Sequence, residues 1–147
     1  MSDPFIIDVI SDVICPWCFL GKRRLDKAIA LLDDVHVMVR WRPFSLDPTI
    51  PPDGLDRSDY LSVKFGAERL TTLHDPLIEA GRKDGVPYDF EAITRTPNTL
   101  DAHRLIHLAG RHGRQDAMKE RLMRAYFTEG EPLGDTQILV RLATDVG

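Results

Sequence analysis

The sequence predicts an α/β fold in which a strand–helix–strand unit is followed by a large all-helical region. Three observations lead to this expectation. Residues 5–10 form a short apolar run that is typical of a buried strand, residues 16–32 repeat apolar side chains at three- and four-residue steps, and residues 35–42 alternate apolar and polar side chains. Beyond residue 46 the apolar residues recur with helical spacing, so we expect a second, helical region at 47–147.

The strand–helix–strand unit is expected to occupy residues 1–46. Its helix carries Leu20 and Ile29 on an apolar side, with polar residues such as Lys22 between them. The second strand places its valines and Trp41 on one face, as a half-buried strand should. Two parallel strands joined by a helix form a right-handed crossover, and such folds place their chemistry at the carboxyl ends of the strands.

The helical region begins after a linker at 47–54 that holds three prolines and therefore cannot form regular structure. Ser58 can cap a helix that runs toward Phe65. Helical spacing continues over 68–82, where Pro76 should kink the helix or end its first half. Three further helices are expected near residues 98–110, 115–128 and 135–142, with Asn98 and Asp135 as start signals and Gly130 as a stop signal.

The two cysteines of the chain, Cys15 and Cys18, stand at the start of the first predicted helix, directly after the first strand. Residues three apart in a helix share a face, so the two sulfurs can come into bonding range. Pro16 suits the first helical position, which puts Cys15 at the N-cap, where unpaired N–H groups and the helix dipole favour a thiolate. We therefore expect Cys15 to be the nucleophile and Cys18 the resolving thiol, with Pro16 and Trp17 beside them as the surface that meets the substrate.

The two residues between the cysteines add neither a formal charge nor a titrating group. We therefore expect a reduction potential between the extremes known for CxxC proteins, roughly −270 to −120 mV.

Composition narrows the class of function. Nineteen basic and twenty-three acidic side chains give a net charge of −4 with both signs mixed along the chain, which argues against a nucleic-acid partner. No apolar run approaches the ~20 residues that span a bilayer, and the N-terminus lacks the pattern of a signal peptide. We expect a cytoplasmic protein without a membrane partner, and in a reducing compartment a lone CxxC is more often redox-active or metal-binding than structural.

These residues resemble the DsbA family of thioredoxin-fold proteins, in its FrnE-like branch. Three motifs in the expected order carry the resemblance: Ile6-Ile7-Asp8-Val9 leading to Cys15-Pro16-Trp17-Cys18-Phe19-Leu20-Gly21, then Trp41-Arg42-Pro43-Phe44, then Thr96-Pro97-Asn98-Thr99-Leu100-Asp101-Ala102-His103-Arg104-Leu105. The resemblance implies a thioredoxin-like βαβ unit with inserted helices, an exposed nucleophile at Cys15 and a buried partner at Cys18. It also implies that Asn98 and Arg104 belong to a helix that faces the redox site, so we expect them to contribute to substrate binding.

The end of the chain departs from this family pattern. A strand preceded by a cis-proline, a hairpin and a final helix should follow the helices, whereas this sequence stops at Gly147. We therefore expect an incomplete thioredoxin fold with two strands of a larger sheet, and a two-stranded sheet is marginal alone. Missing residues or a neighbouring chain would have to cover the exposed edge, so a homodimer is among the expected partners.

A zinc site is one alternative interpretation. Cys15, Cys18, His103 and His107 would make a complete Cys2His2 set, because the two histidines stand four apart on a predicted helix. The two pairs lie far apart in the sequence, however, and a CxxC at a helix mouth after a strand is redox geometry. We expect no metal, and we expect the histidines to belong to a satisfied polar face.

The remaining alternatives involve glutathione. Arg95 and Arg104 could bind an anionic substrate such as glutathione, although helical arginines are more often solvated or paired. The chain also resembles 2-hydroxychromene-2-carboxylate isomerase and the kappa-class glutathione transferases, which carry a serine where Cys15 stands and lack the second cysteine.

The two cysteines favour a thiol–disulfide oxidoreductase that needs no cofactor and acts on disulfides of proteins or small molecules. A glutathione-dependent isomerase or transferase is the second hypothesis.

Overall fold

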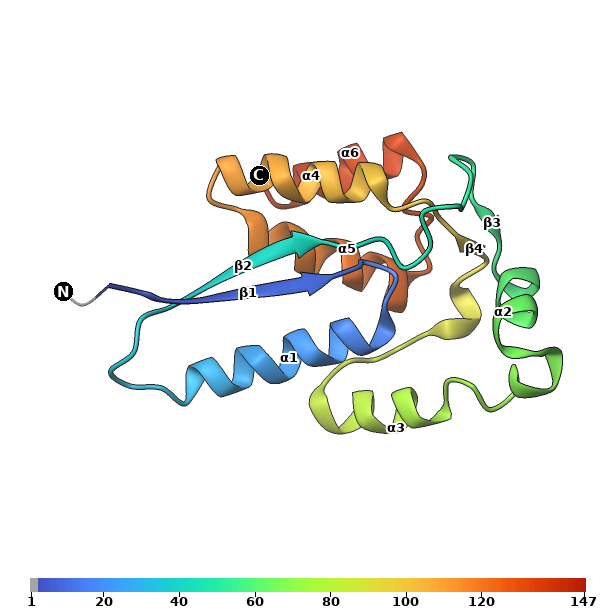
Figure 1. Cartoon of the computed structure of the whole chain (residues 1–147), viewed down its shortest axis with the longest axis horizontal. Coiled ribbons are helices and arrows are strands. Elements are labelled where there is room, and N and C mark those ends of the chain that lie inside the picture. The colour runs from blue at the N-terminus through green and yellow to red at the C-terminus, as the bar shows by residue number, and fades with distance from the viewer. Residues whose placement is uncertain (1–2) are drawn as a thin grey trace.

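The computed structural model describes residues 3–147, which fold into two small sheets and six α-helices (Figure 1). The order is β1 (Phe5–Ser11), α1 (Pro16–Ala30), β2 (Val37–Pro43), β3 (Leu55–Asp56), α2 (Arg57–Phe65), α3 (Asp75–Asp84), β4 (Arg95–Thr96), α4 (Leu100–Arg111), α5 (Gln115–Glu129) and α6 (Thr136–Asp145), with 3₁₀ turns at Ala67–Arg69 and Phe90–Ala92. The expected α/β class, with a strand–helix–strand unit followed by helices, is confirmed.

β1 and β2 form a parallel sheet in which residues 5–11 lie opposite residues 37–43. Side chains alternate between the two faces of a strand, and Val9 and Trp41 point into the core. The opposite face carries Asp8, which accepts two hydrogen bonds from Arg40 at 2.7 and 2.9 Å. Figure 1 shows α1 along one side of this sheet and α4 along the other.

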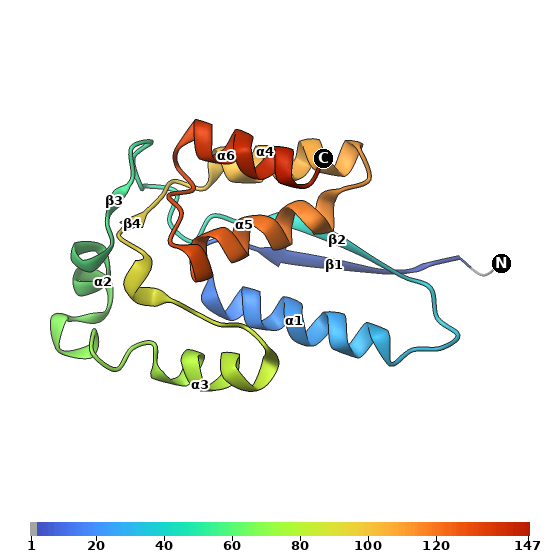
Figure 2. The same ribbon diagram turned by 180° about the vertical axis from the view of Figure 1, so that it is seen from behind.

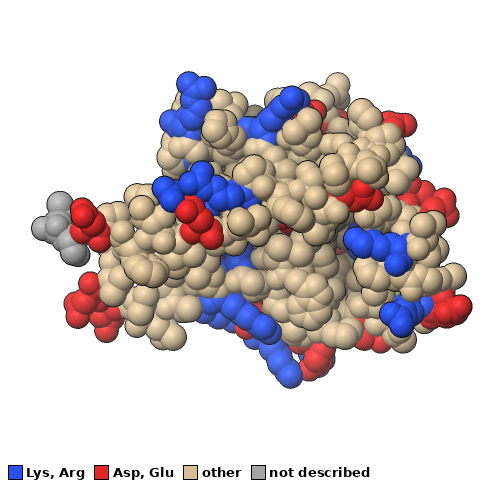
Figure 3. Space-filling model, in the orientation of Figure 1, with Lys and Arg blue, Asp and Glu red and all other residues tan. Residues whose placement is uncertain are grey.

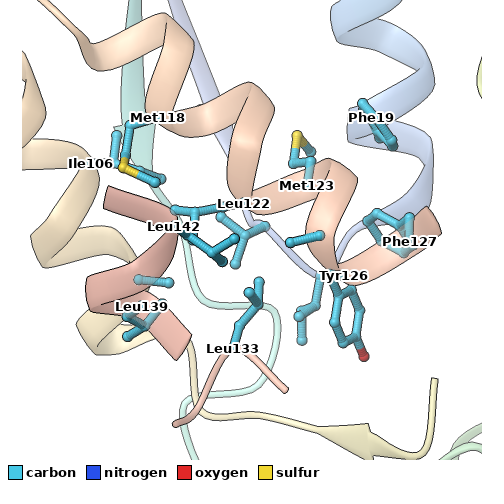
Figure 4. Close-up of a cluster of buried hydrophobic side chains, with 14 of the residues drawn as sticks. Phe19, Ile106, Met118, Leu122, Met123, Tyr126, Phe127, Leu133, Leu139 and Leu142 are labelled. Atoms are coloured by element: carbon cyan, nitrogen blue, oxygen red, sulfur yellow. The ribbon is translucent and has the colours of Figure 1, made fainter. Parts of the chain in front are cut away.

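α5 is the central helix of the molecule. It contacts β2, α1, α4 and α6, and Figure 2 shows it crossing the sheet between α1 and the α4–α6 pair. Because other elements surround it, several of its apolar side chains are fully buried: Met118, Leu122, Met123, Ala125, Tyr126 and Phe127. Figure 4 shows Met118, Leu122, Met123, Tyr126 and Phe127 in this core. One hydrophobic core contains residues from both sides of residue 46, from Val13 to Leu142. The domain boundary at residue 46 stays a prediction.

Two helix starts in the inserted region differ from expectation. Asp56, rather than Ser58, caps α2 by accepting a hydrogen bond from the Asp59 N–H at 3.0 Å. The expected kinked helix over 68–82 is instead a 3₁₀ turn followed by α3, which has Pro76 in its first turn. Proline is tolerated there because the N–H that it lacks would have no partner in the helix.

The last two helices end and begin as expected. Gly130 terminates α5 with a φ of +69°, a conformation that glycine adopts without the steric cost of a side chain. Asp135 caps α6 by accepting hydrogen bonds from the Gln137 and Ile138 N–H groups at 2.8 and 3.2 Å. Local signals are therefore sufficient to place both boundaries.

The free edge of β2 is partly satisfied by a side chain. The Gln115 amide oxygen accepts a hydrogen bond from the Trp41 N–H at 2.9 Å, and its NH₂ group donates to the Trp41 carbonyl at 3.3 Å. Gln115 thus takes the place that the backbone of a neighbouring strand would occupy.

Figure 3 shows charges of both signs scattered over the face that it presents. In residues 3–147 no helix has the length and hydrophobicity that crossing a membrane requires.

Candidate functional site

The amino end of α1 holds both cysteines. Cys15 is the N-cap residue, with an extended backbone (φ −88°, ψ 109°), and its Sγ accepts a hydrogen bond from the Cys18 N–H at 3.3 Å. Pro16 follows as the first residue of the helix. The two thiols are half-buried and are not joined as a disulfide. Cys15 therefore lies where the unpaired N–H groups of α1 point.

A buried carboxylate fixes the turn that presents Cys15. Asp12 is 1% exposed; one carboxylate oxygen accepts a hydrogen bond from the Leu46 N–H at 2.8 Å, and the other lies 3.1 Å from His103 Nε2. His103 Nε2 also lies 3.0 Å from the Phe44 carbonyl. A carboxylate and a carbonyl both accept, so this nitrogen carries the proton and donates to them. Asp12 thereby ties the turn to α4 and to the loop after β2.

Asp12 is ionised at neutral pH despite its burial. Burial alone would raise its pKa, but the hydrogen bonds from His103 and from the Leu46 N–H outweigh it and hold the pKa below the usual range. Asp12 therefore has a buried anchoring role. The partner His103 stands 91 residues away, which no local signal could indicate.

The two thiols ionise as a coupled pair. A hydrogen bond between them stabilises a thiolate on Cys18 while it holds the proton on Cys15, so the pKa of Cys18 is lowered to about 6 and the pKa of Cys15 is raised. Backbone N–H groups of Trp17 and Cys18 favour charge on Cys15, whereas Ser11 and Lys119 favour charge on Cys18. The pair therefore releases its first proton more readily than an isolated thiol does.

Two buried lysines near the dithiol were not foreseen. Lys22 is 3% exposed, in contrast to the polar, outward position that its place in the helix suggested. It pairs with three carboxylates, those of Asp26, Asp116 and Glu120, at 3.0 to 3.3 Å. Lys119 is 1% exposed, and burial lowers its pKa to about 8. Lysines among the polar residues of a helix normally indicate a solvated face, so the sequence did not indicate that Lys22 and Lys119 are buried.

Aromatic residues frame the start of α1. Trp17 is 55% exposed and lies between the two cysteines in the chain, where it offers apolar surface beside the thiols. The Tyr88 hydroxyl donates a hydrogen bond to the Pro16 carbonyl, and the Tyr88 ring packs against Phe19 and Phe90. The connector after α3 thus holds the first turn of α1 in place.

Asn98 lies two residues before α4, whose N-cap is Thr99, and Arg104 lies in the amino-terminal half of the helix. Their surroundings differ. The Asn98 NH₂ group donates to the Ile50 carbonyl at 2.7 Å, and its oxygen accepts from the Leu100 N–H at 2.9 Å. Asn98 therefore anchors the linker to the start of α4. Arg104 is exposed and pairs with Asp101 at 2.9 Å. Substrate binding by either residue stays a prediction.

The other candidate ligands are separated by the fold. Arg95 donates to the Asp53 carbonyl at 2.8 Å, on the β3–β4 pair, whereas Arg104 lines a cavity beside β2. His103 is engaged by Asp12 and by a backbone carbonyl. Across residues 3–147 no three His, Cys, Asp or Glu side chains come together as a metal-binding group.

Known proteins are similar to this chain over nearly its whole length. YwbO of Bacillus subtilis, an uncharacterized protein, is 34% identical over 141 residues, which cover 96% of this chain and 66% of YwbO. The crystal structure of SCO1869 of Streptomyces coelicolor, described as a probable DsbA oxidoreductase, has a TM-score of 0.84 and 33% identity over 97% of this chain and 62% of that one. The chain thus spans about two thirds of the length of these relatives.

A more distant structure is DsbM of Pseudomonas aeruginosa, described as a cytosolic disulfide reductase, with a TM-score of 0.65 and 17% identity over 97% of this chain and 65% of that one. At this identity the similarity shows the fold alone, and it confirms the thioredoxin-like architecture with inserted helices. The sequence profile of the DsbA-like thioredoxin domain matches residues 6–147. Placement in the FrnE-like branch stays a prediction. The chain belongs to the family of DsbA-like thioredoxin-domain proteins.

Proposed function

We propose that the protein is a thiol–disulfide oxidoreductase that acts on protein disulfides through Cys15 and Cys18. The observation that carries the proposal is the position of the Cys15 sulfur at the N-cap of α1, where it accepts the Cys18 N–H at 3.3 Å. A sulfur in this position is favoured as a thiolate, and a second thiol one turn away can resolve what the first one forms. Membership of the DsbA-like family supports the same chemistry.

The reaction proceeds by two exchanges. The Cys15 thiolate attacks one sulfur of a substrate disulfide, a mixed disulfide forms, and the other substrate sulfur leaves as a thiolate. The Cys18 thiolate then attacks the Cys15 sulfur, so the Cys15–Cys18 disulfide forms and the second substrate thiolate leaves. The substrate gains two electrons and the dithiol loses them; the same steps in reverse oxidise a substrate.

The surroundings suit a peptide substrate. Trp17 exposes more than half of its surface beside the thiols, and an exposed indole gives a flanking peptide an apolar contact. We place the reaction in the cytoplasm, in line with the description of DsbM as cytosolic. The lowered pKa of Cys18 gives the pair one thiolate at the pH of that compartment, and movement of the Cys15 proton across the hydrogen bond between the sulfurs places that charge on Cys15.

Trapping of the mixed disulfide tests this assignment of roles. The Cys18→Ser variant, incubated with a peptide that contains one disulfide, should accumulate a covalent adduct on Cys15 that mass spectrometry detects and dithiothreitol releases. The matched Cys15→Ser variant should form little adduct. An adduct that forms as fast on Cys18 in the Cys15→Ser variant would reverse the two roles, and the absence of an adduct in both variants would reject the proposed function.

A further inference from the structure

A cavity of about 440 Å³ lies between β2, α4 and α5, on the far side of β2 from β1. Its volume falls within the range of sites for small molecules, roughly 300 to 1,000 Å³. Much of its wall is apolar and comes from Trp41, Phe44, Leu100 and Ile106. The cavity can therefore accommodate the apolar body of an organic molecule.

The ionisable side chains that line this cavity are all basic. They are Arg42, His103, Arg104, His107 and Lys119, and among the described residues that line it there is no aspartate or glutamate. This contrasts with the whole chain, in which acidic residues outnumber basic ones and the net charge is −4. The local excess of basic groups favours a ligand with negative charge.

Most of these groups already have partners. Arg42 pairs with Asp8 at 2.9 Å, Arg104 pairs with Asp101 at 2.9 Å, and His103 donates to Asp12. His107 lies exposed at the rim. The remaining basic group of the cavity wall, Lys119, therefore decides whether the cavity holds a buried charge without a counter-ion in direct contact.

Lys119 supplies that charge. It is 1% exposed, and within residues 3–147 no carboxylate lies at ion-pair distance from its ammonium group. The Trp41 ring, whose centroid is 5.4 Å from the nitrogen, makes a cation–π contact with the ammonium group, and Cys18 and Asp12 stabilise its charge electrostatically. A buried ammonium without a counter-ion in direct contact is costly. An anion in the cavity would supply that contact.

We propose that this cavity binds an organic carboxylate with an apolar body, whose carboxylate pairs with Lys119 while the body lies against Trp41 and Phe44. The proposal goes beyond the proposed function, because it concerns binding and needs no redox step.

The groups that face Lys119 set the conditions for a test. Its charge is affected by Cys15 at the N-cap of α1, by Cys18 and Lys22 within α1 and by Asp12 in the preceding turn, in addition to the basic groups of the cavity wall. Because burial lowers the pKa of Lys119 only to about 8, most of it is an ammonium at pH 6.5. Affinity for the carboxylate should fall as the pH rises through this pKa, since the cation is then lost.

Isothermal titration at pH 6.5 with 3-phenylpropionate tests the site, and 3-phenylpropanamide serves as a neutral ligand of the same shape. The carboxylate should bind at least about tenfold more tightly than the amide, because a charge-assisted hydrogen bond is worth that factor or more. Lys119→Met should abolish this preference, whereas Lys27→Met, which removes an exposed lysine of α1, should leave it intact. If Lys119→Met does not fold, as judged by circular dichroism, Lys119→Arg should fold and retain the preference.

Equal affinity for the acid and the amide would overturn the proposal. So would an unchanged preference in a folded Lys119→Met protein, or the absence of saturable binding of the carboxylate up to about 10 mM.

Discussion

Replacement of Asp12 by alanine should destabilise the fold by about 2 to 4 kcal/mol. The buried carboxylate accepts hydrogen bonds from the Leu46 N–H and from His103 Nε2, and each such bond to a charged group contributes about 1.5 to 3 kcal/mol. Removal of the carboxylate also removes the cost of its burial, so the net loss is smaller than the sum. For a chain of this size, each kcal/mol lowers Tm by about 2 to 4 °C, which gives a fall of roughly 5 to 15 °C.

The contribution of Asp12 also depends on pH. Its pKa in the folded protein is lowered, so the unfolded state, with a pKa of about 3.9, holds the proton more tightly. The stability that the carboxylate supplies is therefore fully present above about pH 5 and is lost as the pH falls through the folded pKa. Asp12→Ala and Asp12→Asn should both lose stability less steeply on acidification than the unaltered protein does.

Urea denaturation from pH 7 down to pH 3 measures both effects. Asp53→Ala is the matched control, because Asp53 is exposed and its replacement should change the stability by no more than about 0.5 kcal/mol. A loss below about 1 kcal/mol in Asp12→Ala at pH 7, or an acid dependence equal to that of the unaltered protein, would refute the anchoring role of Asp12.

Two further predictions concern packing and charge. Gly130→Ala should lower the free energy of unfolding, measured by urea denaturation, by more than about 2 kcal/mol, because the new Cβ would lie 2.4 Å from the Ala92 carbonyl oxygen. The control Gly113→Ala has the same φ of +69° but open space around the new Cβ, so it should cost about 1 kcal/mol. Equal losses in the two variants would contradict the steric argument. Lys22→Met should lower the free energy of unfolding by about 1 to 3 kcal/mol, because it leaves the carboxylates around Lys22 without their partner. Lys27→Met removes an exposed ion pair and should change the free energy of unfolding by no more than about 1 kcal/mol. A smaller loss in Lys22→Met than in Lys27→Met would reject the role of the buried pair.

Features that depend on a few consecutive residues could be predicted from the sequence. The positions of α1, α5 and α6 follow from apolar spacing together with caps and stops such as Asp135 and Gly130. Cys15 lies at the N-cap because an extended strand, a short turn and Pro16 meet within a few residues. These signals arise from interactions between residues that are close in the sequence.

Features that depend on distant residues could not be predicted. Lys22 is buried because Asp116 and Glu120, from another helix, meet it in the fold, and Lys119 is buried because α5 lies at the centre of the molecule. The pairing of Asp12 with His103 likewise depends on how α4 packs against the turn before α1. Such contacts are set by tertiary packing, whereas the charge pattern of a single helix reports only its own periodicity.

The most direct test of the redox function is the state of the Cys15–Cys18 pair after equilibration in a series of glutathione buffers, with metal chelated, read by alkylation and mass spectrometry. We expect a reversible two-electron transition in which both thiols disappear together, with a midpoint roughly between −270 and −120 mV. Thiols that never pair across the whole range would contradict it, and the CxxC would then be a structural or binding element.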